Sequence, residues 1–360
     1  MKIASIVGTR PNFIKCASVS REIRKEHEEI LIHTGQHYDY EMSKIFFEGL
    51  HIPEPDFYLV VGSGSHGWQT GEILEKVEKV LLNIKPNIVL VYGDCNCTLA
   101  GAIAAAKLHM KVGHIEAGLR SFDRNMPEEI NRVLVDHCSD FLFCPTKTAV
   151  SNLKKEGVEK GVFLTGDVMV DTLNYYRELV KKSDVLNRLG VKRKKYLLAT
   201  IHRPSNTDEK NCLENIADAF CEIDDQIIFP VHPRTEKALK ENGMFDRLEK
   251  HVRVIKPLGY LDFLGLMSYS KKVLTDSGGI QKEAYILNVP CVTLRDSTEW
   301  IETVKDGWNV LVGSDKKKIL DAASNFKPNK TPSNVFVIGA SKNILHTIME
   351  ILINLTTTKK

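Results

Sequence analysis

The segment Lys272–Glu283 reads KVLTDSGGIQKE, an apolar run that passes through a glycine turn into a helical pattern. The run Lys272–Leu274 has the length of a short buried strand. Thr-Asp-Ser-Gly-Gly is a turn composition, and the helical pattern begins at about Ile280. A buried strand that leads directly into a helix is typical of parallel sheets, because helices cover both of their faces. The segment therefore predicts an α/β protein.

The same alternation of apolar runs and helical segments recurs along the 360 residues. In the first half, the predicted strands are Ile3–Val7, Ile30–His33, Ile88–Tyr92, Val112–Ile115, Phe141–Cys144 and Val162–Leu164. In the second half, they are Tyr196–Ile201, Gln226–Val231, Val252–Ile255, Lys272–Leu274, Cys291–Leu294 and Asn309–Val312. Two such series predict two Rossmann-like, doubly wound parallel-sheet domains, with a ligand cleft between them at the carboxyl ends of the strands.

The change from one domain to the next is expected around Val168–Asn187. Residues 1–168 form the predicted N-terminal domain, and residues 169–340 form the predicted C-terminal domain. The tail Ser341–Leu355 has a helical pattern that is expected to cross back, so that residues 341–360 belong to the first domain.

The composition excludes several classes of protein. There are 49 Lys and Arg residues against 46 Asp and Glu residues, and a net charge of +3 is too small to indicate nucleic acid or a membrane surface as the main partner. No run approaches the ~18 apolar residues that a transmembrane helix needs. The eight cysteines form no C-x-x-C pair, so we expect reduced thiols in a cytoplasmic protein. Cys95-x-Cys97 and His114-x-Glu116 lack further ligands at a standard spacing, and we expect no metal site.

Polar residues follow the predicted strands directly, at the edge of the sheet where parallel α/β proteins bind ligands. In the segment quoted first, glycine amides and a helix N-terminus favour an anion, and Glu283 lies about one turn into the helix, where it could accept ribose hydroxyls. The segment thus predicts a nucleoside-diphosphate site, and a plain strand-to-helix turn is the alternative. Arg10, His202 and His232 follow other strands and favour the binding site.

A second glycine pattern, Gly62–Gly67, fits G-x-G-x-x-G. It does not follow the first strand, and no acidic residue stands about 20 residues further on to bind a ribose. We therefore interpret it as a turn before a helix over Gln69–Leu82, and we do not expect an NAD-dependent dehydrogenase.

Taken together, the motifs resemble the non-hydrolysing UDP-N-acetylglucosamine 2-epimerase family over essentially the whole chain. The motifs that carry the resemblance are Gly8-Thr9-Arg10-Pro11, Gly35-Gln36-His37, Gly93-Asp94, EAGLR at 116–120, PEEINR at 127–132 and TDSGGIQKE at 275–283. The resemblance implies the two-domain GT-B fold, a UDP-sugar substrate, no cofactor and a homodimer.

The reaction that the resemblance implies inverts C2 of a UDP-sugar. UDP is eliminated anti across C1–C2 to leave a glycal, which is reprotonated on the other face before UDP adds back. The family's catalytic carboxylates match Asp94, Glu116 and Glu128, and its essential histidine matches His202, a candidate proton donor. Which carboxylate removes the proton and which returns it stays open. The further residues expected at the site are Lys15, which adds positive charge, Arg10, His232, Ser277, Gly278 and Gly279 for the diphosphate, and Glu283 for the ribose.

Two departures from the family pattern bear on the substrate. Asn12 replaces an acid, and Trp300 replaces an arginine. Both changes resemble the branch that acts on UDP-2,3-diacetamido-2,3-dideoxy-glucuronate. Loss of an acid at position 12 would reduce repulsion toward a substrate carboxylate, provided that residue 12 lies near the sugar. We therefore expect that substrate, with UDP-GlcNAc/UDP-ManNAc as the alternative and a GT-B glycosyltransferase or a hydrolysing epimerase as more distant ones.

Further departures concern the surroundings of the site. Cys95 and Cys97 stand where threonines are usual. Trp68 and Asp39 replace the Arg and Gln of members that carry a regulatory second UDP-GlcNAc site, which argues against such a site here.

Overall fold

The structure is a computed structural model, and it describes residues 1–36, 44–333 and 335–357. His37 and Asp39, which belong to the patterns discussed above, lie outside the described residues.

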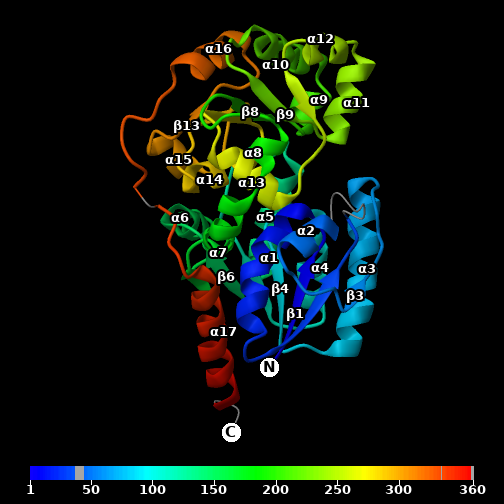
Figure 1. Cartoon of the computed structure of the whole chain (residues 1–360). Coiled ribbons are helices and arrows are strands. Elements are labelled where there is room, and N and C mark those ends of the chain that lie inside the picture. The colour runs from blue at the N-terminus through cyan, green and yellow to red at the C-terminus, as the bar shows by residue number, and fades with distance from the viewer. Residues whose placement is uncertain (37–43, 334, 358–360) are drawn as a thin grey trace. The chain divides into compact units, whose positions relative to one another are not determined.

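The chain divides into two compact units (Figure 1). The first comprises Met1–Tyr175 and Phe336–Lys360, and the second comprises Tyr176–Val335. The domain ranges that we predicted from the sequence, 1–168 with 341–360 and 169–340, stay a prediction.

Within the described residues, the first unit contains a seven-stranded sheet in which all neighbouring strands are parallel. In spatial order the strands are β3 (Phe57–Tyr58), β2 (Glu28–His33), β1 (Lys2–Val7), β4 (Ile88–Tyr92), β5 (Val112–Ile115), β6 (Phe141–Cys144) and β7 (Val162–Leu164). The helices of this part of the chain are α1 (Arg10–Ile23), α2 (Lys44–Gly49), α3 (His66–Ile84), α4 (Asn96–Lys107), α5 (Pro127–Cys138), α6 (Lys147–Lys155), α7 (Val168–Lys182) and α17 (Ala340–Thr357).

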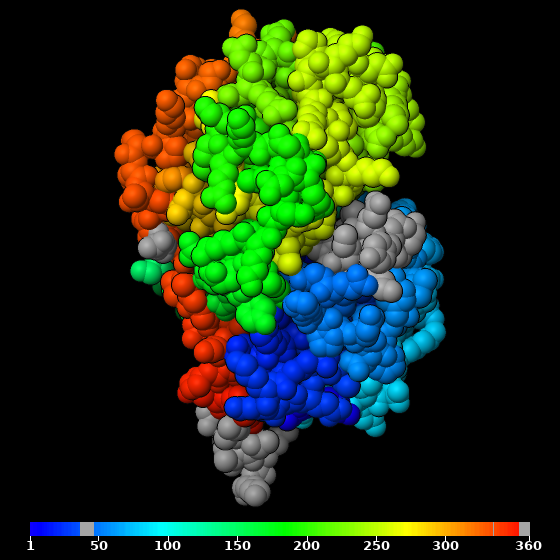
Figure 2. Space-filling view, viewed as in Figure 1, coloured from blue at the N-terminus to red at the C-terminus, as the bar shows by residue number. Residues whose placement is uncertain are grey.

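Helices cover both faces of this sheet because the side chains of each strand alternate between the faces. Ala4 and Ile6 of β1 belong to the apolar core under α3 and α4. Ser5, between them, points the other way and donates to the buried Glu29 carboxylate, which also accepts from Ser20 of α1. α17 packs against α1 on this second face (Figures 1 and 2).

The second unit, as far as the structure describes it, contains a six-stranded parallel sheet. In spatial order the strands are β10 (Arg253–Ile255), β9 (Ile227–Pro230), β8 (Leu197–Thr200), β11 (Lys272–Thr275), β12 (Cys291–Thr293) and β13 (Asn309–Leu311). The helices are α8 (Val185–Arg188), α9 (Pro204–Thr207), α10 (Lys210–Glu222), α11 (Pro233–Glu241), α12 (Phe245–Glu249), α13 (Tyr260–Ser268), α14 (Gly278–Ile286), α15 (Ile301–Lys305) and α16 (Lys316–Asn325). Leu197 and Leu198 of β8 belong to two separate cores, one on each face.

In each sheet the strand order reverses at one point, and parallel sheets bind ligands at the carboxyl ends of the strands beside that point. The reversal lies between β1 and β4 in the first unit and between β8 and β11 in the second. Arg10, Asp94, His202 and Ser277 follow these four strands within a few residues. The topology therefore places predicted site residues at the binding edge of each sheet.

Each strand predicted from the sequence is present, and Ile88–Tyr92 and Phe141–Cys144 match residue for residue. The two-residue strand β3 was not predicted, because two residues give no readable periodicity. The turn at Gly62–Gly67 is shorter than predicted, since its last two residues already belong to α3. Likewise α14 begins at Gly278, not at about Ile280. No helix among the described residues has the length and apolarity needed to cross a membrane.

Candidate active site

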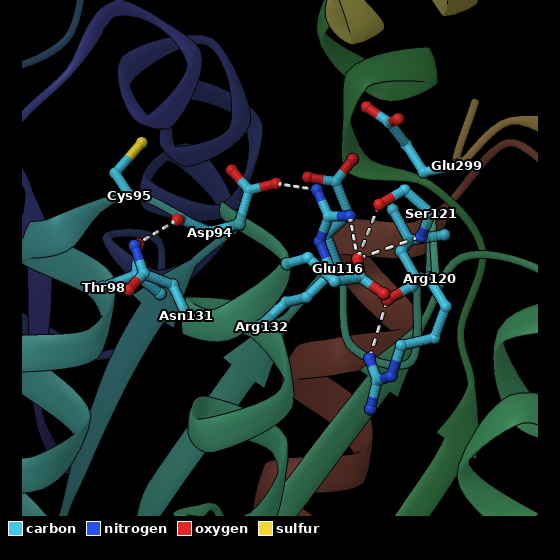
Figure 3. A network of polar contacts seen from close by, with 12 residues as sticks. Asp94, Cys95, Thr98, Glu116, Arg120, Ser121, Asn131, Arg132 and Glu299 are labelled. Atoms are coloured by element: carbon cyan, nitrogen blue, oxygen red, sulfur yellow. Dashed lines mark hydrogen bonds and ion pairs between the residues drawn. The ribbon is translucent and has the colours of Figure 1, made fainter. Parts of the chain in front are cut away.

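A polar network in the first unit joins the residues that follow β4 and β5 to α5 (Figure 3). Figure 3 shows the Arg132 side chain between Asp94 and the loop that carries Ser121. The network contains two of the three predicted catalytic carboxylates, Asp94 and Glu116, and each of them is paired with a cation.

Glu116 follows β5 in a left-handed backbone conformation, with φ at 75°, which residues with a side chain rarely adopt. Its carboxylate forms an ion pair with the Lys15 ammonium from α1, and both side chains are less than one-tenth exposed. Burial lowers the pKa of Lys15, but the carboxylates of Glu116 and Asp94 outweigh it and raise the pKa above its usual range. Lys15 is therefore a permanent positive charge beside Glu116.

Asp94 follows β4 and is held by α5. Arg132 donates one hydrogen bond to Oδ2 of Asp94 at 2.5 Å and another to Oε2 of Glu129 at 2.6 Å. Glu129 also accepts from the backbone N–H groups of Ser121 and Phe122, both at 2.9 Å. Because Glu129 is anchored to the backbone in this way, Arg132 fixes the Asp94 carboxylate relative to α5.

Glu128, the third predicted carboxylate, lies on the first turn of α5 and is half-buried. Among the described residues its side chain has no hydrogen bond or ion pair, in contrast to its neighbour Glu129. An acid in the first turn is favoured by the helix dipole. The structure thus does not bring Glu128 into the network of Asp94 and Glu116.

Asn12 is fully buried in the first turn of α1. Its Oδ1 accepts from the backbone N–H groups of Gly8 and Thr9, and its Nδ2 donates to the carbonyl of Tyr92 at 2.7 Å. The side chain therefore offers no exposed group for direct contact with a sugar, and the electrostatic argument from position 12 stays a prediction.

His114 links the buried Asp136 to the turn that carries Asp94. Its Nδ1 lies 2.7 Å from Oδ1 of Asp136, and its Nε2 lies 2.7 Å from the carbonyl oxygen of Gly93. Asp136 is also bound by Arg120, and burial is outweighed by His114 and Arg120, which lower the pKa of its carboxyl. With both ring nitrogens engaged, His114 orients the turn that precedes Asp94. In residues 1–36, 44–333 and 335–357, no cluster of three or more His, Cys, Asp or Glu side chains suited to a metal ion is found.

In the second unit, the buried Asp276 after β11 ties together the turn that follows β8. Its carboxylate accepts from the backbone N–H groups of His202 and Arg203 at 3.0 to 3.2 Å, from Asn206 at 3.1 Å, and lies 3.1 Å from His202 Nδ1. Burial opposes ionisation, but His202 and these N–H groups outweigh it and lower the pKa of Asp276 to about 2. The ionised Asp276 carboxylate therefore holds the His202 ring in place.

The predicted binding residues of the second unit surround the start of α14. Ser277 is the N-cap residue, and its N–H donates to Oγ1 of Thr275 at 3.0 Å. A Cβ atom at Gly278 would lie 2.1 Å from Oε1 of Glu299 and would displace that carboxylate, whereas Gly279 has room. About one helical turn further on, the buried Glu283 accepts from the hydroxyl of Tyr260 at 2.9 Å.

Two further predicted residues lie at helix starts. His232 is the N-cap of α11, where its Nδ1 accepts from the N–H of Arg234, and its ring centroid lies 5.8 Å from that of His202. Arg10, in the first unit, is the first residue of α1 and is half-buried.

Comparison with known proteins identifies the family. The model of the family described as UDP-N-acetylglucosamine 2-epimerase matches residues 21–350. The chain belongs to the UDP-N-acetylglucosamine 2-epimerase family. A "UDP-N-acetylglucosamine 2-epimerase homolog" of Methanococcus maripaludis is 56% identical, over 99% of this chain and 100% of its own. The "UDP-2,3-diacetamido-2,3-dideoxy-D-glucuronate 2-epimerase" of Pseudomonas aeruginosa is 48% identical, over 90% of this chain and 91% of its own.

Solved structures of the family agree with the fold. The UDP-GlcNAc 2-epimerase of Methanocaldococcus jannaschii, crystallised with UDP-GlcNAc and UDP, is 47% identical with a TM-score of 0.92, over 98% of this chain and 100% of that one. The predicted family, the class of two Rossmann-like domains known as GT-B, and the expectation of an enzyme of the UDP-sugar 2-epimerase type are thereby confirmed.

Sequence reasoning assigned no role to three arginines of these networks, Arg132, Arg203 and Arg295. Arg132 is three residues after Glu129 on α5, a spacing that signals their pairing, but its bond to Asp94 spans 38 residues and has no local signal. Arg295 donates to Glu299 at 2.9 Å, and Nη2 of Arg203 lies 3.9 Å from the same carboxylate. These charges lie at the N-terminus of α14, where an anion is favoured.

Trp300, which stands where the family pattern has an arginine, is buried. The Lys282 ammonium lies 4.1 Å from its ring centroid in a cation–π contact. Trp300 therefore packs against the Lys282 ammonium of α14, and it does not provide the positive charge that an arginine would have at this position.

Proposed function

We propose that this member of the UDP-N-acetylglucosamine 2-epimerase family is a non-hydrolysing UDP-N-acetylhexosamine 2-epimerase. The observation that carries the proposal is the pair of carboxylates, Asp94 and Glu116, which follow adjacent strands and are each held by a separate cation. Inversion at one carbon needs proton transfer on both faces of the ring, and two independently fixed carboxylates meet that need.

The proposed reaction begins with removal of the proton on C2 by a carboxylate. The electron pair of the C2–H bond forms the C1=C2 double bond, and the C1–O bond breaks with its electrons on the diphosphate. The glycal then receives a proton on the opposite face of C2 while UDP adds back to C1. Asp94, Glu116 and Glu128 are the candidate acid/base groups, and His202 is the candidate proton donor to the leaving UDP or the sugar.

Lys15 and Arg132 serve this chemistry by holding the Glu116 and Asp94 carboxylates in place. The ammonium of Lys15 also offers positive charge to the departing diphosphate, because the pKa of Lys15 lies above its usual range. No redox step occurs, so the proposed reaction needs no nicotinamide.

The second unit is proposed to bind the UDP part of the same substrate. Its N-terminal turn of α14 offers backbone N–H groups at Gly278 and Gly279 and the Ser277 hydroxyl to a diphosphate. His232 and Arg10 are proposed to add contacts to the phosphates, and Glu283, oriented by Tyr260, to bind the ribose. We also propose that the protein is a cytoplasmic homodimer.

Two substrates are candidates. Trp300 and the relative from Pseudomonas aeruginosa favour UDP-2,3-diacetamido-2,3-dideoxy-glucuronate. The structure from Methanocaldococcus jannaschii, at nearly the same identity, favours UDP-GlcNAc/UDP-ManNAc. We keep the diacetamido-uronate as the leading proposal.

Incubation with each sugar, followed by proton NMR of the anomeric region, tests the proposal. We expect the C2 epimer of one of them to appear without net release of UDP. Asp94→Asn and Glu116→Gln should abolish its formation, whereas Asp140→Asn, which alters a surface carboxylate paired with Lys111, should leave it unchanged. Accumulation of free UDP would favour a hydrolysing epimerase, and no change with either sugar would contradict the proposed substrates.

A further inference from the structure

Asn12 connects the two strand ends at the point where the strand order of the first sheet reverses. On one side, its Oδ1 accepts from the N–H of Gly8 at 3.3 Å and from the N–H and hydroxyl of Thr9 at 3.1 and 2.9 Å. On the other side, its Nδ2 donates to the carbonyl of Tyr92, the last residue of β4, at 2.7 Å. The sulfur of Cys97 also contacts Oδ1, at 3.1 Å.

Of the side chains of this size, only a carboxamide satisfies both sides. The groups from Gly8 and Thr9 are donors and need an acceptor, whereas the Tyr92 carbonyl is an acceptor and needs a donor. An ionised aspartate would turn a second acceptor toward the Tyr92 carbonyl. Alanine would remove the acceptor of the Gly8 and Thr9 N–H groups, whereas the Tyr92 carbonyl would keep only its bond from the Thr98 hydroxyl. Because Asn12 is fully buried, water cannot replace what is lost.

The residues that Asn12 joins lead directly into the site. Thr9 precedes Arg10, and Tyr92 precedes Gly93 and Asp94. The backbone of Gly93 lies close to the Lys15 ammonium, because a Cβ atom at Gly93 would lie 2.5 Å from Nζ of Lys15. A shift of the end of β4 would therefore move Asp94 relative to Lys15.

In the second sheet a buried side chain also connects the two strand ends at the reversal point, but it comes from the later strand. There the side chain that follows the later strand, Asp276 after β11, reaches the backbone after the earlier strand, at His202 and Arg203. In the first sheet the side chain comes from the turn after the earlier strand, β1, and reaches the end of the later one, β4. In both sheets a buried side chain thus sets the spacing of the two strand ends that carry site residues.

We propose that Asn12 is a positioning residue for the epimerase reaction, whose carboxamide sets the position of Asp94 relative to the turn that carries Arg10. The proposal rests on the proposed function for its kinetic part. It assigns to Asn12 a role through Asp94 and no contact with substrate.

The test compares Asn12→Asp and Asn12→Ala with Asn87→Asp. Asn87 is a matched control, because its Oδ1 accepts from the N–H of Lys2 at the amino ends of β1 and β4, far along the same strands. Well below the melting temperature of every variant, we expect Asn12→Asp to lower kcat at least tenfold and the affinity for UDP less than threefold. Asn12→Ala should lower kcat less, since it removes a bond without placing two acceptors together. Asn87→Asp should match the wild type in both quantities.

The proposal is overturned if both Asn12 variants keep kcat within twofold of the wild type. It is equally overturned if kcat and UDP affinity fall in the same proportion, since that is the result of general loss of native structure. A second readout does not depend on catalysis: the alkylation rate of Cys97, followed by mass spectrometry, should rise at least tenfold in Asn12→Ala and not in Asn87→Asp. If the wild type epimerises neither sugar but this rate rises, the proposed function fails while the link through Asn12 stands. An unchanged rate would refute the link itself.

Discussion

Replacement of Arg132 with methionine should destabilise the first unit and release the Asp94 carboxylate from α5, while Asn131 still bonds the Asp94 carbonyl. The Arg132 side chain is 2% exposed and lies 2.5 Å from Asp94 and 2.6 Å from Glu129, whose side chains are 30% and 4% exposed. Removal of one partner from a buried ion pair costs about 3–5 kcal/mol. We expect about 3 kcal/mol here, at the low end of that range, because Glu129 keeps its donors from Ser121 and Phe122 and Asp94 is partly solvated.

A solvent-exposed ion pair with the same nitrogen–oxygen distance provides the control for this prediction. Lys111 and Asp140 also lie 2.5 Å apart, but their side chains are 44% and 31% exposed. Such pairs contribute about 0–1 kcal/mol, so Lys111→Met should cost under about 1 kcal/mol. Burial, and not distance, should thus separate the two variants.

Urea unfolding followed by circular dichroism measures the stability part, and the initial rate of epimerisation measures the catalytic part. A carboxylate displaced by about 1 Å loses on the order of 100-fold in rate, and we expect a loss of that order in kcat for Arg132→Met. In a double-mutant cycle, Asp94→Asn should cost much less stability in the Arg132→Met background than in the wild type. Equal costs for Arg132→Met and Lys111→Met, or an unchanged kcat, would refute the reasoning.

Three other predictions address single contacts. Lys15→Met should cost about 3–5 kcal/mol and reduce kcat at least 100-fold, because it removes the buried cation beside Glu116; wild-type melting temperature and rate would contradict this. The folded-state pKa of Asp276 is depressed from 3.8 to about 2, so it contributes about 2 kcal/mol, which is present above about pH 4 and lost as the pH falls toward 2. The stability difference between the wild type and Asp276→Asn should therefore shrink over that interval in acid titrations, and a constant difference would be the opposing result. Gly278→Ala should weaken UDP binding in calorimetry more than Gly279→Ala does, because only the former places a Cβ atom 2.1 Å from Glu299; equal losses would count against the close packing there.

The strands and their order along the chain could be predicted because each is a continuous apolar run between polar segments. Val112–Ile115 and Val162–Leu164 were predicted to the residue for this reason. The strand β3 was beyond such reasoning, because Phe57–Tyr58 pairs with β2 through a contact that its own two residues do not specify. Helix starts were displaced by two or three residues at α3 and α14, where glycines next to the N-cap belong equally to a turn or to a first helical turn.

The residue types of the site could be predicted from their places after strands, but the direction of each side chain could not. Asn12 illustrates the limit: its position after β1 suggested a ligand contact, and yet its carboxamide turns inward to the end of β4. Arg132 illustrates the opposite case. Its position on a helix did not suggest a contact with the site, and yet its guanidinium bonds the Asp94 carboxylate, 38 residues away in the sequence. Such pairings depend on tertiary distances that no local pattern contains.

The most direct test of the central proposal is exchange of the C2 hydrogen in deuterated water. The enzyme is incubated with UDP-2,3-diacetamido-2,3-dideoxy-glucuronate and, separately, with UDP-GlcNAc, and the C2 position is followed by NMR. Elimination and re-addition predict that solvent deuterium enters C2 of one sugar as its epimer forms, and that Asp94→Asn or Glu116→Gln slows this exchange. Formation of the epimer with the original hydrogen retained at C2 would contradict proton transfer through these carboxylates.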